Sequence, residues 1–348
     1  MTKILIIYTG GTIGMVHDHK GQLVPFDFDN IKNNVPELNR LNYHIDVISF
    51  NPLIDSSNMS PSDWKKIALL IGSSYNKYDG FVILHGSDTM AYTASALAYM
   101  FENLSKPIVL TGSQLPIGEI RTDAKENLIT ALEIAASKNN DGTATVPEVC
   151  IYFDYHLFRG CRATKTHADK FDAFKSPNYP ILAEAGVHLK FNVDYIANPK
   201  FKELKIHTEF SGTIAVLKLF PGITKLYVES VLNTPNLDAV LIEGFGVGNT
   251  STETWFVNLL KTASEKEIIL FDITQCGGGT VEIGRYETST HLSEMGVISG
   301  RDLTFEAAIT KLMFLFGNYN DKQLINQKLI ENLRGEINMI EHNENINS

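Results

Sequence analysis

The sequence predicts an α/β protein with a larger N-terminal domain, built on a doubly wound, mostly parallel sheet, and a smaller C-terminal α/β domain. Three observations support this prediction. Short apolar segments end in turns that contain glycine, helical patterns lie between them, and the same alternation resumes after a polar stretch. Strands that are apolar on both faces are typical of parallel sheets, and their alternation with helices is typical of doubly wound folds. A chain of 348 residues is long enough for two domains.

Three strands are expected in the N-terminal half, at residues 4–8, 81–84 and 107–110. Each apolar segment is too short for a typical helix, and each is followed by a turn that contains glycine. The polar side chains of these turns are therefore expected at the carboxyl ends of parallel strands, where α/β enzymes place their chemistry.

Three helices are expected between and after these strands. Ser60 is the predicted N-cap of the first, with Pro61 at its first position and Asp63 in its first turn. Residues 89–103 are rich in alanine and apolar on most sides, which predicts a buried helix. Residues 122–137 predict the third.

A polar segment at residues 191–211 separates the two halves and is typical of a linker. Beyond it the alternation resumes, with strands expected at 214–219, 239–242 and 268–273, the last two followed by glycine-rich turns. The expected division of the chain is residues 1–190, a linker at 191–211, a second domain at 212–340 and a polar tail at 341–348.

The composition argues against several classes of protein. A formal net charge of −10 argues against nucleic-acid binding, which needs a basic surface. Cys150, Cys161 and Cys276 are too few and too widely spaced for a disulfide framework or a zinc site, so reduced thiols are expected. The first residues lack the pattern of a secretory signal, and no apolar run is long enough for a transmembrane helix. We therefore expect a cytoplasmic protein that does not bind membranes.

Hydroxyl side chains follow two of the predicted strands. Residues 9–14 read T-G-G-T-I-G, and residues 85–89 read H-G-S-D-T. Glycines let a ligand approach the backbone closely, and a hydroxyl beside a carboxylate is a candidate nucleophile site. Lys165 is a candidate partner, because a lysine held beside Ser87 or Asp88 can take part in proton transfer.

Each of these features also has a structural interpretation. A glycine turn after a strand occurs in nucleotide sites, although the first turn lacks both the G-x-G-x-x-G spacing and the lysine of a P-loop. Ser87 and Asp88 are favoured as helix caps, and a lone lysine such as Lys165 is usually a solvated charge. His85 and His167 lack the spacing of metal ligands, so no metal site is predicted.

Taken together, these motifs resemble those of the bacterial-type L-asparaginase family. Further matches are D-S-S at 55–57 before Met59, T-K at 164–165 and G-V-G-N at 246–249. The matches come in the family's order and cover about the first 280 residues. T-Q-C at 274–276 resembles the cytoplasmic type I branch. The family also includes glutaminase-asparaginases and a subunit of an archaeal tRNA amidotransferase.

The resemblance implies an amidohydrolase that converts L-asparagine to L-aspartate and ammonia without a metal or cofactor. Family members are homodimers or dimers of dimers, with the site at a subunit interface. Thr12 would be the nucleophile that forms an aspartyl ester. The second catalytic group would be Ser87, Asp88 and Lys165, which would polarise the reacting groups and relay protons. The substrate-binding residues implied are Gly11, Asp55, Ser56, Ser57, Gly86, Ser87, Asp88 and, from the neighbouring subunit, Asn249.

The sequence departs from the family at three places. Ser87 stands where the family usually has threonine. Residues 15–30 contain no tyrosine, which many relatives have in this loop, and Gln22 and Leu23 lie near the expected position, so the group that activates Thr12 is not identified. Glu243 replaces the arginine that binds the effector in the allosteric type I enzyme. The implied effector pocket is therefore vestigial and consists of Thr164, Glu243, Thr274, Gln275 and Cys276.

Other functions compete with this one. A dinucleotide-dependent oxidoreductase would need G-x-G-x-x-G, which is missing. An asparaginase-like glutaminase shares the motifs, and the sequence does not decide between asparagine and glutamine. A non-catalytic amino-acid-binding protein or amidotransferase partner would keep the fold, but the complete set of Thr12, Asp88 and Lys165 argues against a loss of catalysis.

Overall fold

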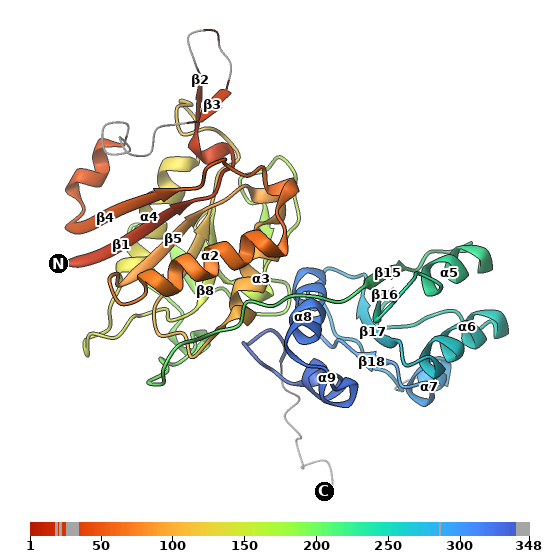
Figure 1. Ribbon diagram of the computed structural model, residues 1–348. Coiled ribbons are helices and arrows are strands. Elements are labelled where there is room, and N and C mark those ends of the chain that lie inside the picture. Colours follow the sequence, from red (N-terminus) through yellow and green to blue (C-terminus); the bar gives the residue numbers. More distant parts are fainter. Residues whose placement is uncertain (18–19, 21–22, 26–34, 285–286, 339–348) are drawn as a thin grey trace, which may run out of the picture. The chain divides into compact units, whose positions relative to one another are not determined.

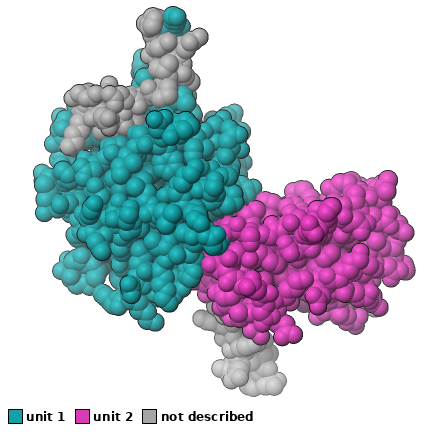
Figure 2. All heavy atoms as spheres, viewed as in Figure 1, with its two compact units in different colours: residues 1–209 teal, residues 210–348 magenta. Residues whose placement is uncertain are grey.

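The computed structural model describes residues 1–17, 20, 23–25, 35–284 and 287–338, and in these the chain forms two compact units (Figure 2). Unit 1 comprises Met1–Glu209 and unit 2 comprises Phe210–Ser348. The division falls inside the polar segment 191–211. Among the described residues, no helix has the length and apolar character needed to span a membrane.

Unit 1 is built on an eight-stranded sheet (Figure 1). Five neighbouring strands are parallel, and the remaining three extend the sheet at one edge as antiparallel strands. In sheet order the strands are β13 (Leu189–Phe191), β12 (Ala183–Ala185), β9 (His156–Arg159), β8 (Val149–Phe153), β7 (Ile108–Thr111), β5 (Gly80–Leu84), β1 (Thr2–Tyr8) and β4 (Tyr43–Ser49).

Helices cover both faces of this sheet. Figure 1 shows α2 (Pro61–Ser74) and α3 (Met90–Met100) on one face and α4 (Ala124–Ala136) on the other. Both faces of the central strands are buried, and neighbouring residues such as Ile6 and Ile7 of β1 are each fully inaccessible to solvent. The continuous apolar pattern of these strands arises from this double burial.

The remaining elements of unit 1 are short, and several belong to the loops that carry the site. They are η1 (Thr12–Gly14), β2 (Met15–His17), β3 (Leu23–Pro25), η3 (Pro36–Arg40), η4 (Ser56–Asn58), η5 (Ser87–Thr89), β6 (Phe101–Glu102), η6 (Gly160–Arg162), β10 (Thr164–Lys165), β11 (Phe174–Lys175), η7 (Val193–Tyr195) and β14 (Lys205–Ile206).

Unit 2 contains a four-stranded parallel sheet with helices around it. In sheet order the strands are β15 (Ile214–Lys218), β16 (Ala239–Gly244), β17 (Ile269–Thr274) and β18 (Ile298–Ser299). The helices are α5 (Lys225–Leu232), α6 (Thr254–Glu265), α7 (Glu287–Glu294), α8 (Phe305–Asn318) and α9 (Lys322–Ile330). A separate apolar cluster, which includes Val228, Val240 and Phe256, forms the core of this unit.

The predicted fold class is confirmed, and all six predicted strands exist. The cap of α2 also forms as predicted, because the Ser60 backbone N–H and hydroxyl both donate to the Asp63 carboxylate. All three cysteines are free, with Cys276 exposed and the other two buried. The polar tail 341–348 lies outside the described residues.

The helix predicted at 89–103 is wrong at its C-terminal end. It stops at Met100, because residues Phe101–Glu102 turn into an extended conformation and pair with β14. Asn103 then takes a left-handed conformation with a φ of 64°, which a helix cannot accommodate. The partner strand, β14, lies about 100 residues away in the sequence, so the local helical pattern gives no indication of this pairing.

Candidate active site

Three loops of unit 1 meet at one edge of its sheet. The loops follow β1, β5 and β4, which are adjacent and parallel, and Tyr8 of β1 lies opposite both Leu84 of β5 and Ser49 of β4. The three strands therefore end at the same level. Their loops place the segments 9–14, 85–89 and 55–57 next to one another.

Glycines allow these loops to touch through their backbones. Gly11 has a φ of 93°, and a Cβ built on it would lie 2.5 Å from the Gly86 backbone nitrogen. A Cβ on Gly86 would in turn lie 2.5 Å from Ser56 Oγ. Any side chain at either glycine would force the loops apart.

The turn that carries Thr12 is fixed from below. Thr9 Oγ1 donates a hydrogen bond of 2.9 Å to the Leu84 carbonyl, and Tyr8 Oη donates one of 3.0 Å to the Gly14 carbonyl. Burial raises the pKa of Tyr8 to about 12, so its hydroxyl stays protonated and remains a donor. Thr12 begins η1 directly above these contacts and is half-buried.

The 55–57 segment forms a compact cap beside this turn. The Asp55 carboxylate accepts hydrogen bonds from Ser57 Oγ at 2.7 Å and from the Ser57 backbone N–H at 3.0 Å. These two bonds lower the pKa of Asp55, and the bond from the Ser57 side chain has the larger effect. Thr89 Oγ1 donates to the Ser56 carbonyl at 2.7 Å, which ties the segment to the second turn. Asp55 thus holds Ser57 through one carboxylate oxygen, Oδ1.

Lys165 reaches the second turn from a distant part of the chain. It lies on β10, and its Nζ donates to Ser87 Oγ at 2.9 Å and to Asp88 Oδ1 at 2.6 Å. The lysine side chain is only 14% exposed, whereas that of Asp88 is 68% exposed. A lysine ammonium has no acceptor, so Ser87 receives this bond and its own O–H is left to donate elsewhere. This chain of groups can move a proton between Ser87 and Asp88 through Lys165.

His85 supports the second turn from inside the core. It is fully buried, with Nδ1 2.7 Å from the Gly86 carbonyl and Nε2 2.9 Å from Thr93 Oγ1, while Trp64 Nε1 donates to that same hydroxyl. A carbonyl only accepts, so Nδ1 carries the proton and Nε2 accepts from Thr93. Burial lowers the pKa of His85 to about 4 and keeps the ring neutral. His85 is therefore structural, and among the described residues no group of acidic, His or Cys side chains could hold a metal ion.

Sequence reasoning did not single out Asp123, which shapes the next loop. Its carboxylate accepts from the backbone N–H groups of Gln114 at 2.9 Å and Leu115 at 3.1 Å, and burial raises its pKa. Asn127 Nδ2 donates to the Gly112 carbonyl at 2.9 Å. This loop follows β7, the neighbour of β5. The position of Asp123 at the start of the helix predicted at 122–137 is the signal that the sequence offers.

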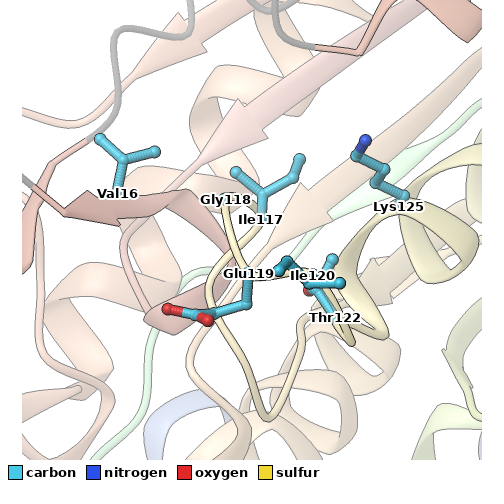
Figure 3. A pocket seen from close by; sticks show the side chains of 7 residues that line it. All are labelled: Val16, Ile117, Gly118, Glu119, Ile120, Thr122 and Lys125. Carbon is cyan, nitrogen blue, oxygen red and sulfur yellow. The ribbon is translucent and has the colours of Figure 1, made fainter.

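A hollow of about 380 Å³ lies beside this loop (Figure 3). Val16 contributes from β2, and the other lining residues come from the loop before α4 and the first turn of that helix. None of the predicted site residues lines it. The full lining is Val16, Ile117, Gly118, Glu119, Ile120, Thr122 and Lys125.

The other predicted residues are divided between the units. Thr164 lies in unit 1, whereas Asn249, Glu243, Thr274, Gln275 and Cys276 lie in unit 2. Within unit 2, Gln275 Nε2 donates to the carbonyls of Leu219 and Glu243, both at 2.6 Å. Thr274 Oγ1 donates to the Gly246 carbonyl at 2.5 Å. The positions of Gln22 and the side chain of Leu23 lie outside the described residues.

Comparison with known proteins identifies the family. Residues 3–197 match the family model described as asparaginase, N-terminal, and residues 213–329 match the glutaminase/asparaginase C-terminal domain. The chain belongs to the asparaginase family. Both units of the fold therefore have family counterparts, in the same order along the chain.

Individual relatives cover nearly the whole chain. L-asparaginase 1 of Escherichia coli strain K12 is 42% identical over 96% of this chain and 98% of its own length. The crystal structure of L-asparaginase I from Vibrio cholerae has a TM-score of 0.87 at 38% identity, and covers 97% of this chain and 99% of its own. The thermostable L-asparaginase from Thermococcus kodakarensis has a TM-score of 0.88 at 31% identity, with 97% and 100% covered.

Proposed function

We propose that this protein is an L-asparaginase that hydrolyses L-asparagine to L-aspartate and ammonia. The observation that carries the proposal is the contact of Lys165 Nζ with both Ser87 and Asp88, in a loop packed against the Thr12 turn. Family membership supports it, because relatives that match nearly the whole chain are named L-asparaginases.

Thr12 acts as the nucleophile in this proposal. Its hydroxyl oxygen attacks the side-chain amide carbon of the substrate, the C–N bond breaks, and ammonia leaves with the proton that Thr12 has lost. Water then attacks the aspartyl ester and regenerates the Thr12 hydroxyl. A covalent intermediate divides a slow amide hydrolysis into two easier steps, the formation of an ester and its hydrolysis. The Thr12 hydroxyl is the nucleophile of the first step and water that of the second, so we propose a reaction without metal or cofactor.

Ser87, Asp88 and Lys165 form the second catalytic group. Lys165 holds the Ser87 hydroxyl, which donates a proton to the leaving nitrogen in the first step and accepts one from the attacking water in the second. Asp88 keeps one carboxylate face exposed to solvent, and this face receives the substrate α-ammonium. Gly11 and Gly86 bring backbone N–H groups to the acyl oxygen, the arrangement that stabilises a tetrahedral intermediate. Ser56 and Ser57 hold the α-carboxylate, with Asp55 fixing Ser57.

Asn249 completes the site from a neighbouring copy of the chain. We therefore propose a homodimer or homotetramer, with residues 1–190 carrying the catalytic hydroxyls and 212–340 supplying Asn249. The resemblance to the cytoplasmic type I branch supports a cytoplasmic location. Analytical ultracentrifugation combined with Asn249→Ala tests both parts, because a monomer with full activity would contradict them.

A second candidate function is that of an amidotransferase partner. A protein of Sulfolobus acidocaldarius named as a subunit of glutamyl-tRNA(Gln) amidotransferase is 32% identical over 99% of this chain, and the match spans 77% of that protein. Such a partner would deliver ammonia to a second enzyme. It would not hydrolyse free asparagine as a complete reaction of its own. Ammonia release by the purified chain alone distinguishes the two.

The test is a coupled ammonia assay with L-asparagine and with L-glutamine, without added metal or nucleotide. We expect hydrolysis of asparagine and slower hydrolysis of glutamine, because one extra methylene in a tight pocket costs about 1–3 kcal/mol. Thr12→Ala serves as the matched control and should reduce kcat at least about a thousandfold. Near-normal turnover in Thr12→Ala, or activity that a chelator abolishes and zinc restores, would refute this mechanism.

A further inference from the structure

Asp272 is an acidic side chain buried in the interior of unit 2. It lies on β17 and is fully buried, and neither carboxyl oxygen has a hydrogen-bond partner among the described residues. Two other buried acids are paired with cations, since Glu148 contacts Arg159 at 2.5 Å and Glu336 contacts Lys311 at 2.7 Å. Burying a polar group without partners is costly, so a carboxyl at this position calls for a reason.

The two carboxyl oxygens face two glycines of one loop. A Cβ built on Gly244 would lie 2.7 Å from Asp272 Oδ1, and a Cβ built on Gly248 would lie 2.6 Å from Oδ2. Gly248 has a φ of 95°, which glycine adopts without strain. The loop therefore closes over the carboxyl, with one glycine against each oxygen, and no side chain fits between them.

This loop fixes the backbone of Asn249. The Phe245 N–H donates to the Asn249 carbonyl at 2.8 Å, and the Asn249 N–H donates back to the Phe245 carbonyl at 2.7 Å. The Gly248 N–H also donates to the Phe245 carbonyl at 3.0 Å. These bonds close a tight turn with Asn249 at its end. The carboxyl of Asp272 forms the floor of the turn. It packs against Gly248, which directly precedes Asn249 in the chain.

We propose that Asp272 is a positioning residue for Asn249, acting through the turn that Gly244 and Gly248 close over its carboxyl. The proposal rests on the function argued above, in which Asn249 reaches the substrate of a neighbouring subunit. The carboxyl works in its neutral form, since no cation pairs with it among the described residues. Burial raises the pKa of Asp272 well above its usual range. The Gly244 backbone lowers this pKa, but its effect is smaller than that of burial.

The shape of the group matters more than its charge in this arrangement. Asparagine has the same branched, planar end as a protonated aspartic acid, so Asp272→Asn should keep the floor of the turn. Asp272→Ala removes that floor, and Asp272→Ser removes part of it. Leu270→Ala is the matched control, because Leu270 is buried on the same face of β17, two residues from Asp272 and farther from the turn.

The experiment measures kcat and KM for L-asparagine in the wild-type protein and these variants, together with their melting temperatures. We expect Asp272→Ala to raise KM about tenfold or more while kcat changes less than about threefold. Asp272→Asn should stay within about twofold of the wild type in both constants. Leu270→Ala should lower the melting temperature and leave KM unchanged.

A double-mutant cycle with Asn249→Ala isolates the coupling between the two residues. In that background, Asp272→Ala should raise KM less than about twofold further, because its effect passes through Asn249. If Asp272→Ala does not fold, Asp272→Ser takes its place in the cycle with an intermediate rise in KM.

Independent, multiplicative effects of the two substitutions would overturn the inference. So would a rise in KM for Leu270→Ala equal to that of Asp272→Ala, or an Asp272→Asn variant as impaired as the alanine variant. Each of these outcomes is compatible with an active wild-type protein, so it would refute this inference without refuting the proposed function. A wild-type protein that releases no ammonia from asparagine would instead refute the proposed function, and this inference with it.

Discussion

Lys165 Nζ lies 2.9 Å from Ser87 Oγ, although the two residues are 78 positions apart in the chain. The contact arises because Lys165 sits on the short strand β10, which pairs with β11 and places the lysine over the end of β5. The lysine is largely shielded from solvent while its second partner, Asp88, is exposed. The shielded end of this group is thus Lys165, and the open end is the Asp88 carboxylate, which faces solvent.

Replacing Lys165 with methionine should abolish most of the activity without loss of the fold. Methionine keeps the length of the side chain but removes the Nζ atom that contacts both Ser87 and Asp88. We expect kcat to fall at least about a thousandfold, as is typical when one member of a catalytic unit is lost. Steady-state kinetics measures the effect, and circular dichroism confirms folding. A decrease of less than about tenfold would show that Lys165 only holds the loop.

The hydroxyl at position 87 should matter, and the methyl group should not. Ser87→Thr keeps an oxygen within reach of Lys165 Nζ, and threonine is what the family usually has there. We expect Ser87→Thr to retain activity within about threefold and Ser87→Ala to lose at least about a hundredfold in kcat. Assays of both variants at saturating asparagine decide the matter. Equal rates for the alanine variant and the wild type would remove Ser87 from the mechanism.

Local patterns in the sequence predicted the strand ends but not what meets there. The turns at 9–14 and 85–89 are visible because an apolar strand followed by glycine is a short-range signal. The contacts of Gly86 with Gly11 and with Ser56 depend on β1 lying between β5 and β4, which is a long-range fact. The residues alone offered Lys165 as one candidate partner of the second turn, and the family resemblance singled it out, because an isolated lysine carries no pattern of its own.

Other parts of the fold were missed for comparable reasons. Strand β4 was not predicted, since Tyr43–Ser49 forms an edge of the sheet and mixes polar with apolar residues. In Asp272 the sequence shows an acid inside an apolar strand, but its lack of partners appears only in three dimensions. The loop that Asp123 organises was likewise invisible, because its donors are backbone groups of Gln114 and Leu115.

His85 should make the protein less stable in mild acid. Its pKa is about 4 in the folded protein, because burial disfavours the charged ring, against an ordinary value of 6.5. The unfolded chain therefore binds a proton at this residue between pH 6.5 and about 4, and the folded protein does not. The contribution of His85 is fully present above pH 6.5 and falls by about 3 kcal/mol as the pH drops to about 4.

The comparison of wild type with His85→Gln isolates this contribution. Glutamine can still donate to the Gly86 carbonyl and accept from Thr93, but it does not titrate. Urea unfolding at pH 7 and at pH 4.5 should show that the wild type loses about 2–3 kcal/mol more than the variant over this interval. Identical pH dependence in the two proteins would mean that His85 is not held neutral in the core.

The buried pair of Lys311 and Glu336 should anchor the segment that follows α9. Both side chains are fully buried, and Lys311 Nζ lies 2.7 Å from Glu336 and donates to the Leu329 carbonyl at 3.0 Å. Lys311→Met would leave the Glu336 carboxylate buried without its cation, at a cost of about 3–5 kcal/mol in the free energy of unfolding. Denaturant titration measures the loss.

An exposed pair provides the control for this prediction. Lys225 and Glu229 are 3.6 Å apart on the surface of α5, so Lys225→Met should cost no more than about 0.5 kcal/mol. Substitution of both Lys311 and Glu336 by apolar residues should cost less than Lys311→Met alone, because no charge is left buried. A similar small loss for Lys311→Met and Lys225→Met would contradict the anchoring role.

Asparagine should not activate this enzyme through the effector pocket of its allosteric relatives. In that pocket an arginine can hold the effector carboxylate with two charge-assisted hydrogen bonds, whereas this chain has Glu243. The Glu243 carboxylate contacts Lys218 Nζ at 3.1 Å, so the nearest cation is already paired with it. Thr274 and Gln275 donate to main-chain carbonyls.

The saturation curve for L-asparagine at constant enzyme concentration tests this prediction. Allostery requires different affinities for the effector in two states, and a pocket that has lost its main anion anchor has little with which to produce that difference. We expect a hyperbola with a Hill coefficient of about 1, both in the wild type and in Thr164→Ala. Sigmoidal kinetics that disappear in Thr164→Ala would show that the pocket is functional. If Lys218→Met also abolished that sigmoidality, Lys218 would be identified as the group that leaves Glu243 to bind the effector carboxylate.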